Sequence, residues 1–237
     1  MDGVTRRGWM AMAALPMLAG LAAYAGSEEG LLPGVDRSRF AAAGPGTARE
    51  QLQRAHLPNV PLVTQDGARV RFYDDLVRDR KVVLTFMSSD AVAPSTTVAG
   101  NLAKLQRFFG ARVGRDMFLY SISRTPERDT PAVMREWARQ NAAGPGWTFL
   151  TGEPADVEQL RRGLGFVSPD PAEDADPAFA VGQLRHGVEA EMRWGHCQAL
   201  ASPRVIAHAL LLDFGQGAAA PNAAPPWNCS LALAELA

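Results

Sequence analysis

A short apolar run that stops abruptly before a helix start constrains the fold more than any other part of this sequence. Val82–Met87 consists of apolar and β-branched residues without helical spacing, which predicts a central strand buried on both faces. Ser88–Ala93 is then a short loop, and Pro94 suits the first turn of a helix, where its missing N–H costs nothing. Apolar residues follow at helical spacing: Leu102, Leu105, Phe108 and Phe109. This order predicts a functional site in the loop, because free backbone N–H groups and the helix dipole point into it.

Strands and helices alternate further along the chain. Asp116–Ser123 is predicted to be a buried strand, and Trp147–Gly152 a strand that runs into a turn. Helices are expected after Pro131 and over Ala155–Leu164, where apolar residues return at helical spacing. Crossovers of this kind place strands in parallel, so the sequence predicts an α/β domain.

The two ends of the domain carry different signals. Leu57–Thr64 and Ala68–Phe72 are predicted to form a hairpin around an Asp-Gly turn. Toward the C-terminus, Ser168–Ala178 has the composition of a Pro- and Asp-rich loop, and Phe179–Arg204 has no clear period. Val205–Asp213 is an apolar run that we expect to be the last strand of the sheet.

Three segments resemble the Sco/SenC family in sequence and in order. Phe86 and Pro94 match the pattern Phe-x-x-Cys-x-x-x-Cys-Pro without a gap. The segment 123–131 matches Ser-x-Asp-Pro-Glu-Arg-Asp-Thr-Pro except that Thr125 replaces the first acidic residue, and Trp147–Gly152 matches Trp-x-x-Leu-Thr-Gly. The resemblance implies a thioredoxin-like α/β fold, with a central mixed sheet flanked by helices and an added N-terminal β-hairpin.

The same resemblance identifies what the loop lacks. Family members bind copper through the two loop cysteines and a histidine near the last strand, and help to build the copper centre of respiratory oxidases. Ser89 and Ala93 occupy the cysteine positions here. Cu(I) prefers thiolate ligands, while a serine hydroxyl is a hard, weak ligand and alanine offers no donor. We therefore expect neither the family's copper site nor dithiol chemistry in this loop.

A substitute metal site is the alternative. Measured eight residues back from Asp213, the family's histidine position falls on Val205, and His208 lies three residues later. His196 and Cys197 form an adjacent pair of softer ligands, and His186, ten residues earlier, could join them in a substitute metal site. Each signal is weak, because a single histidine in an apolar run is more often a packed residue than a ligand. A hydrolase nucleophile at Ser89 has less support still, since no Gly-x-Ser-x-Gly motif surrounds it.

Charge and cysteine content limit the function further. The formal net charge is -1, with Lys+Arg 24 against Asp+Glu 25, so nothing indicates nucleic-acid binding. Cys197 and Cys229 are the two cysteines. In an oxidising compartment they are expected to form a disulfide that ties the C-terminal tail to the domain.

The chain divides into four segments by composition. Residues 1–25 hold the pair Arg6-Arg7 before a modest apolar run and predict a Tat-type signal peptide, with an uncleaved anchor as the alternative. Residues 26–56 are a predicted flexible linker with a helical turn near the end, 57–217 the thioredoxin-like domain, and 218–237 an Ala/Pro-rich tail. The expected location is the periplasm, soluble or anchored to the inner membrane.

These observations together favour a role other than catalysis. We expect an exported protein of respiratory oxidase copper-centre assembly that is not an enzyme, has no cofactor and acts by binding an oxidase subunit or a copper-assembly protein. The alternative is a functional copper chaperone or thiol redox protein whose metal ligands are His208, Cys197 and His196. A third hypothesis is a degenerate paralogue without function.

Overall fold

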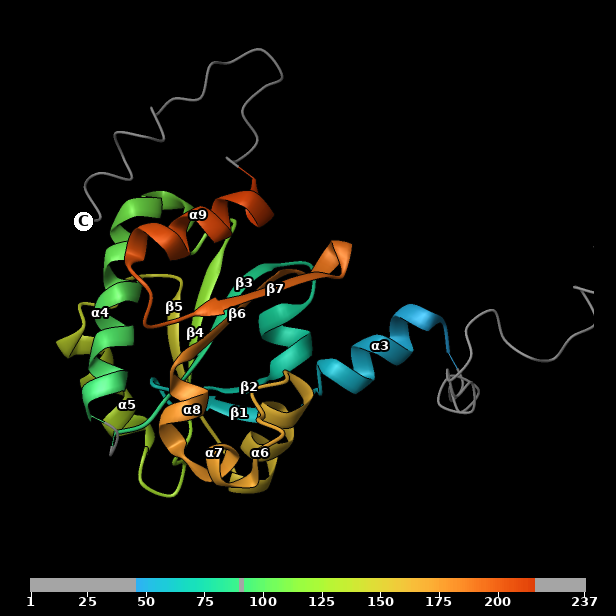
Figure 1. Ribbon diagram of the computed structural model, residues 1–237, viewed down its shortest axis with the longest axis horizontal. Coiled ribbons are helices and arrows are strands. Elements are labelled where there is room, and N and C mark those ends of the chain that lie inside the picture. The colour runs from blue at the N-terminus through green and yellow to red at the C-terminus, as the bar shows by residue number, and fades with distance from the viewer. Residues whose placement is uncertain (1–45, 90–91, 216–237) are drawn as a thin grey trace, which may run out of the picture. The chain divides into compact units, whose positions relative to one another are not determined.

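A seven-stranded mixed sheet organises the part of the chain that the computed structural model describes, residues 46–89 and 92–215 (Figure 1). The strands are β1 (Pro61–Thr64), β2 (Arg69–Arg71), β3 (Lys81–Met87), β4 (Phe118–Ser123), β5 (Trp147–Thr151), β6 (Gln183–Val188) and β7 (Arg193–Gln198). Their order across the sheet is β2-β1-β5-β4-β3-β6-β7. β3, β4 and β5 run parallel, whereas β1 is antiparallel to β5 and β6 is antiparallel to β3.

Helices cover both faces of this sheet. The helices of the described residues are α3 (Ala48–His56), which buries no side chain, α4 (Val92–Phe109), α5 (Pro131–Gln140), α6 (Pro154–Gly163), α7 (Pro171–Ala175), α8 (Pro177–Val181) and α9 (Pro203–Phe214). A π-helical turn at Phe72–Val77 joins β2 to β3. No helix among the described residues combines the length and the apolar character that crossing a membrane requires.

Two apolar clusters, one on each face, contain the buried side chains of the central strand. Val83 and Met87 pack with apolar residues of α4, α5 and α9 on one face. Val82, Leu84 and Phe86 pack on the other face with residues of α6 and the π-helical turn. Successive strand residues point to opposite faces, so this alternation confirms that β3 is buried on both sides.

The N-terminal and central predictions agree with the structure. β1 and β2 form the expected hairpin, with Leu62 opposite Val70. α4 begins at the loop after β3, and Leu102, Leu105 and Phe109 are buried as their spacing predicts. Thr130 caps α5 by accepting a hydrogen bond from the Val133 N–H.

The prediction of a last strand in the C-terminal part is wrong. Val205–Asp213 lies within α9 and is not the last strand. Pro203 begins this helix, and Ile206, Ala207, Leu210 and Phe214 form its buried side. A short apolar run does not separate a strand from a buried helix, and here the helix covers the sheet instead of extending it.

Sequence reasoning missed the antiparallel pair β6–β7, which forms one edge of the sheet. The pair lies in Phe179–Arg204, the segment without a clear period. Its strands carry Gly187 and Gly195, charged residues and histidine, so they show little alternation of apolar and polar residues. A Cβ on Gly187 would lie 2.3 Å from the Trp194 ring, so the cross-strand packing of that ring requires glycine. The expected loop 168–178 also contains two short helices, α7 and part of α8.

A buried carboxylate joins α3 to the turn between β6 and β7. Glu189, at the turn between β6 and β7, is fully buried and accepts hydrogen bonds from Arg49 at 2.8 Å, Tyr73 at 3.0 Å and the Asp79 N–H at 2.8 Å. The helix fills the last residues of the segment 26–56 that composition predicts as a linker, which includes the expected helical turn.

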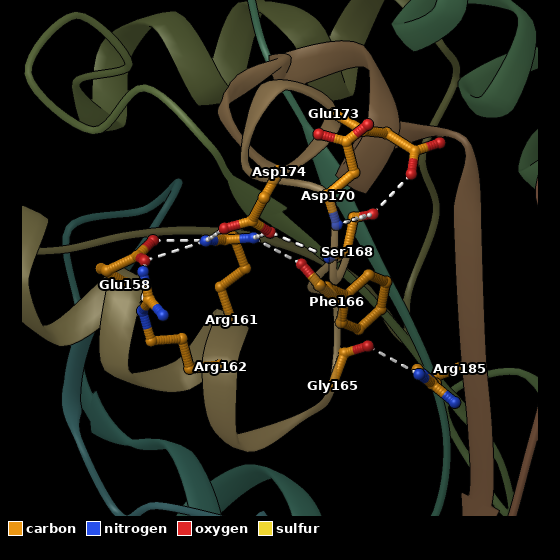
Figure 2. A network of polar contacts seen from close by, with 10 residues as sticks. All are labelled: Glu158, Arg161, Arg162, Gly165, Phe166, Ser168, Asp170, Glu173, Asp174 and Arg185. Carbon is orange, nitrogen blue, oxygen red and sulfur yellow. Dashed lines mark hydrogen bonds and ion pairs between the residues drawn. The ribbon is translucent and has the colours of Figure 1, made fainter.

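A buried arginine fixes α6 to α7. The Arg161 side chain is 2% exposed and donates to Glu158 at 2.8 Å, to Asp174 at 2.7 Å and to the carbonyl oxygen of Phe166 at 2.6 Å. Figure 2 shows its guanidinium next to both carboxylates, and Arg162, drawn below Glu158, also donates to that carboxylate. These bonds hold the pKa of both carboxyl groups below its ordinary value and raise the pKa of the guanidinium.

Candidate functional site

The candidate site lies where β3 and β4 end side by side, because parallel strands bring their carboxyl ends to one edge. Ser88, directly after β3, is fully buried. Its N–H donates to Ser95 Oγ at 3.0 Å, and Ser95 Oγ donates back to the Ser88 carbonyl at 2.8 Å. This reciprocal pair fixes the end of the strand to the first turns of α4.

A chain of hydroxyl groups connects this loop to the loop after β4. Ser88 Oγ lies 3.0 Å from Thr125 Oγ1, and Thr125 Oγ1 donates to Asp129 Oδ2 at 3.1 Å. Since the Thr125 proton is used on Asp129, Ser88 is the donor in the first bond. Ser123 Oγ donates to the same Asp129 oxygen at 2.5 Å. The fully buried Asp129 is thus the acceptor on which both loops converge.

The donor atoms of this site are hard oxygen ligands. Ser89 is half-buried and Ala93 is exposed at the start of α4, while Asp90 and Ala91 between them lie outside the described residues. Within residues 46–89 and 92–215 there is no group of three or more His, Cys, Asp or Glu side chains that could hold a metal ion. The residues described at this loop therefore do not fit Cu(I), which prefers thiolate.

The structure separates Cys197 from His196. They are neighbours on β7, so their side chains point to opposite faces of the sheet. Cys197 is half-buried against the cluster that contains α9, and burial raises the pKa of its thiol to about 11. His196 is exposed. Cys197 is a free thiol among the described residues, and the expected disulfide stays a prediction because Cys229 lies outside them.

His208 lies on the solvent side of α9 and not on a strand. Val205, the position eight residues before Asp213, is exposed on the same helix, so this spacing leads neither to a strand nor to a histidine. Among the described residues, the structure does not bring His208, His196 and Cys197 into one ligand group.

His186, which the sequence offers as a further ligand beside His196 and Cys197, is buried on the same side of the sheet as α9. His186 Nδ1 lies 3.0 Å from Asp213 Oδ2, and its ring packs edge-on against Phe214. Burial lowers the pKa of His186 more than the Asp213 carboxylate raises it. The ring of this histidine therefore packs against the end of α9, and its burial favours the neutral form.

Comparison with known proteins identifies the family to which this chain belongs. The SCO1/SenC family pattern matches residues 48–181, and the chain belongs to that family. No curated protein sequence matches the chain. Its thioredoxin-like fold, with a mixed sheet between helices, is that of the solved Sco structures.

Three solved structures illustrate the likeness. A SCO1/SenC family lipoprotein from Bacillus anthracis is 16% identical with a TM-score of 0.53, covering 66% of this chain and 94% of its own. Yeast Sco1 with copper bound is 14% identical with a TM-score of 0.50, covering 64% and 87%. BsSco, a member of the Sco family of cytochrome c oxidase assembly proteins, is 17% identical with a TM-score of 0.50, covering 66% and 91%. At these identities the likeness concerns the fold.

Asp129 is the site residue whose role the sequence did not predict, although it lies in the recognised motif. One signal was available. Thr125, which replaces the family's acidic residue, stands four residues before Asp129, and a hydroxyl at that distance across a tight loop can donate to a carboxylate. Two acidic residues at these positions would repel each other, whereas Thr125 and Asp129 form a hydrogen bond.

Proposed function

We propose that this protein is an exported Sco/SenC domain that acts in respiratory oxidase copper-centre assembly by binding a partner, without a thiolate copper site and without catalysis. The observation that carries the proposal is the network from Ser88 through Thr125 to Asp129. It joins the two loops through hydroxyl groups at the place where family members have their cysteine chemistry. The link to oxidase assembly comes from the family and from the description of BsSco.

The chemistry of Cys197, the cysteine that lies among the described residues, supports the same proposal. A thiol must lose its proton to bind copper or to attack a disulfide. The pKa of Cys197 is raised to about 11, so little thiolate exists at neutral pH. With hydroxyl groups at the loop, what the domain keeps is a rigid surface at the ends of β3 and β4.

A competition titration against a Cu(I) chelator tests the metal half of the proposal. We expect the wild-type domain to lose Cu(I) to the chelator and the double variant Ser89→Cys/Ala93→Cys to retain it. The single variants Ser89→Cys and Ala93→Cys are the matched controls, since one thiolate gives a much weaker site. Tight binding by the wild type that disappears in Cys197→Ser or His208→Ala would overturn the proposal and favour the substitute site.

The assembly half needs a cellular measurement. In the source organism, deletion of this gene should lower the copper content and activity of the respiratory oxidase. A copy carrying Cys197→Ser and His208→Ala should restore both, because neither residue carries the proposed role. Unchanged oxidase in the deletion strain would refute the assembly function, whatever the result of the copper titration.

A further inference from the structure

Arg185 is a half-buried arginine on β6 that forms an ion pair with no carboxylate of the described residues. Its Nη2 donates to the Gly165 carbonyl at 2.7 Å, and its Cζ lies 5.7 Å from the centre of the Phe166 ring (Figure 2). Burial lowers the pKa of Arg185, and among the described residues no acidic group offsets that effect. A cation withdrawn from water normally has an anionic partner, so this one needs an explanation.

The guanidinium group lies at the wall of a cavity of about 360 Å³. Arg185 and Gly165 both line this cavity. A Cβ on Gly165 would lie 3.0 Å from Nη2 and 3.7 Å from Cζ, so the guanidinium packs directly on that glycine. Nε is inaccessible and unpaired, whereas Nη1, which also makes no hydrogen bond within the described residues, is not among the inaccessible atoms. Nη1 therefore keeps two N–H donors that a ligand can reach.

The strand pairing brings a second basic side chain to the same face of the sheet. Arg185 lies directly opposite His196 of β7. The ladder bond from the Ala199 N–H to the Gly182 carbonyl makes this a non-hydrogen-bonded pair, in which opposite side chains are closest. Two residues that can both carry positive charge destabilise a strand pair, and an anion beside them removes the repulsion.

The rest of the cavity wall is mainly apolar. Leu52 and His56 come from α3, Leu164 from the end of α6, and Met192 and Trp194 from the β6–β7 edge. The described residues that line the cavity include no Asp or Glu. Walls from several segments make the site concave, and its volume lies in the range of small-molecule pockets. The lining therefore favours a small molecule that combines an apolar body with a negative charge.

We propose that this cavity binds a small carboxylic acid with an apolar body, such as an aryl-alkanoate, through Arg185. The carboxylate accepts hydrogen bonds from the guanidinium, whose single charge it balances, and the body packs on Leu52, Leu164 and Trp194. The inference goes beyond the proposed function and does not depend on it. The cavity shares no residue with the network from Ser88 through Thr125 to Asp129.

The test is a titration of the ¹⁵N-labelled full chain with 3-phenylpropanoate, followed at the tryptophan indole N–H resonances. Trp194 lines the cavity, whereas the Trp147 indole donates to Ser121 in the core and is the internal control. We expect a saturable shift at Trp194 and none at Trp147. The amide 3-phenylpropanamide has the same body without the charge and should bind at least about tenfold more weakly. Acetate, which lacks the apolar body, should give no shift.

Three variants make the result specific. Arg185→Gln should weaken 3-phenylpropanoate by about tenfold or more and leave 3-phenylpropanamide within about twofold. Leu52→Glu places a carboxylate at the cavity from a position that is 51% exposed, so it should also weaken the acid and serves if Arg185→Gln is not folded. Arg193→Gln is the matched control, since Arg193 is exposed on β7, points to the opposite face from Trp194 and does not line the cavity. The amide spectrum of each variant reports whether it is folded.

Several results would overturn the inference. These are equal affinities for the acid and the amide, unchanged affinity in both Arg185→Gln and Leu52→Glu, an equal loss in Arg193→Gln and Arg185→Gln, a shift with acetate as large as with 3-phenylpropanoate, or no saturable shift at Trp194. None of these results depends on copper. A failure here is therefore distinct from a failure of the chelator titration or of the oxidase measurement.

Discussion

Thr125 shows how one substitution changes the chemistry of a loop without changing its course. The motif from Ser123 to Pro131 otherwise matches the Sco/SenC pattern, and the loop still ends at the N-cap of α5. The hydroxyl of Thr125 donates toward Asp129 and accepts from Ser88, a combination that a carboxylate at this position cannot provide. Substitutions at Ser89, Ala93 and Thr125 thus fall on the two loops that meet at the site.

The bond between Ser88 and Thr125 should be measurable as a coupling energy. A double-mutant cycle with Ser88→Ala and Thr125→Val is expected to give about 1 kcal/mol, because each single change removes the hydrogen bond between the two hydroxyl groups. Urea unfolding of the four proteins supplies the free energies. The cycle of Ser88→Ala with the exposed Ser202→Ala is the control and should be additive; equal coupling in both cycles would contradict the network.

Cys197 should react slowly for a cysteine. In Cys229→Ser, where it is the remaining thiol, its pKa of about 11 leaves about 300-fold less thiolate at pH 7 than an ordinary cysteine has. The rate of alkylation by iodoacetamide should rise with pH up to about pH 11. Cys197→Ser, which keeps Cys229, gives the reference rate for a thiol of the same chain. A plateau of the Cys197 rate near pH 8 would show that burial does not control it.

Among the elements, those with a periodic pattern or a turn motif could be predicted, and those defined by long-range contacts could not. β3 and the β1–β2 hairpin follow from apolar runs and an Asp-Gly turn, and α6 follows from the spacing of Val157, Leu160 and Leu164. α9 and β6–β7 were missed because their identity depends on packing. The apolar side of α9 is formed against α4 and β7, which the local sequence does not specify.

The arginine network between α6 and α7 should be a major source of local stability. Arg161→Met removes a buried cation that bonds both carboxylates and the Phe166 carbonyl, so we expect a loss of about 3–5 kcal/mol in the free energy of unfolding. Arg162→Met is the matched control, since Arg162 also binds Glu158 but is 65% exposed. It should cost about 0–1 kcal/mol. Similar losses in the two variants would contradict this account.

His186 should make the stability of the α9 region depend on pH. Burial lowers its pKa in the folded protein, so the unfolded chain binds a proton more readily. Its contribution is fully present above the unfolded pKa of about 6.5 and is lost as the pH falls from there through the lower folded pKa. His186→Gln should remove this part of the slope in urea unfolding at pH 7.5, 6.5 and 5.5. An identical dependence of the free energy of unfolding on pH in the variant would contradict this role of His186.

At the scale of the whole molecule, the family pattern ends before the sheet does. It covers residues 48–181, whereas β6, β7 and α9 follow. β3 pairs with β6 from Lys81 to Thr85, so a chain that stops at 181 exposes the edge of a strand that is apolar on both faces. The central fold was therefore predictable from motifs, while the closing edge required the structure.

This arrangement predicts how truncated chains behave. A chain ending after Val181 should aggregate, because the open edge of β3 can pair with another chain. A chain ending after Gly215 keeps α9 and should remain soluble and monodisperse. Soluble yield and size-exclusion chromatography distinguish the two. Equal solubility would mean that the last two strands and α9 are dispensable for closing the sheet.

The bond from Arg49 to Glu189 has a mechanical consequence. If the residues before Gly46 hold the protein at a bilayer, tension on them is transmitted through α3 to the turn between β6 and β7. At the opposite end of β3, Ser88 bonds Thr125, which donates to Asp129, so the loops of the candidate site lie apart from this connection. A force applied to α3 would therefore reach the β6–β7 edge of the sheet before it reached those loops.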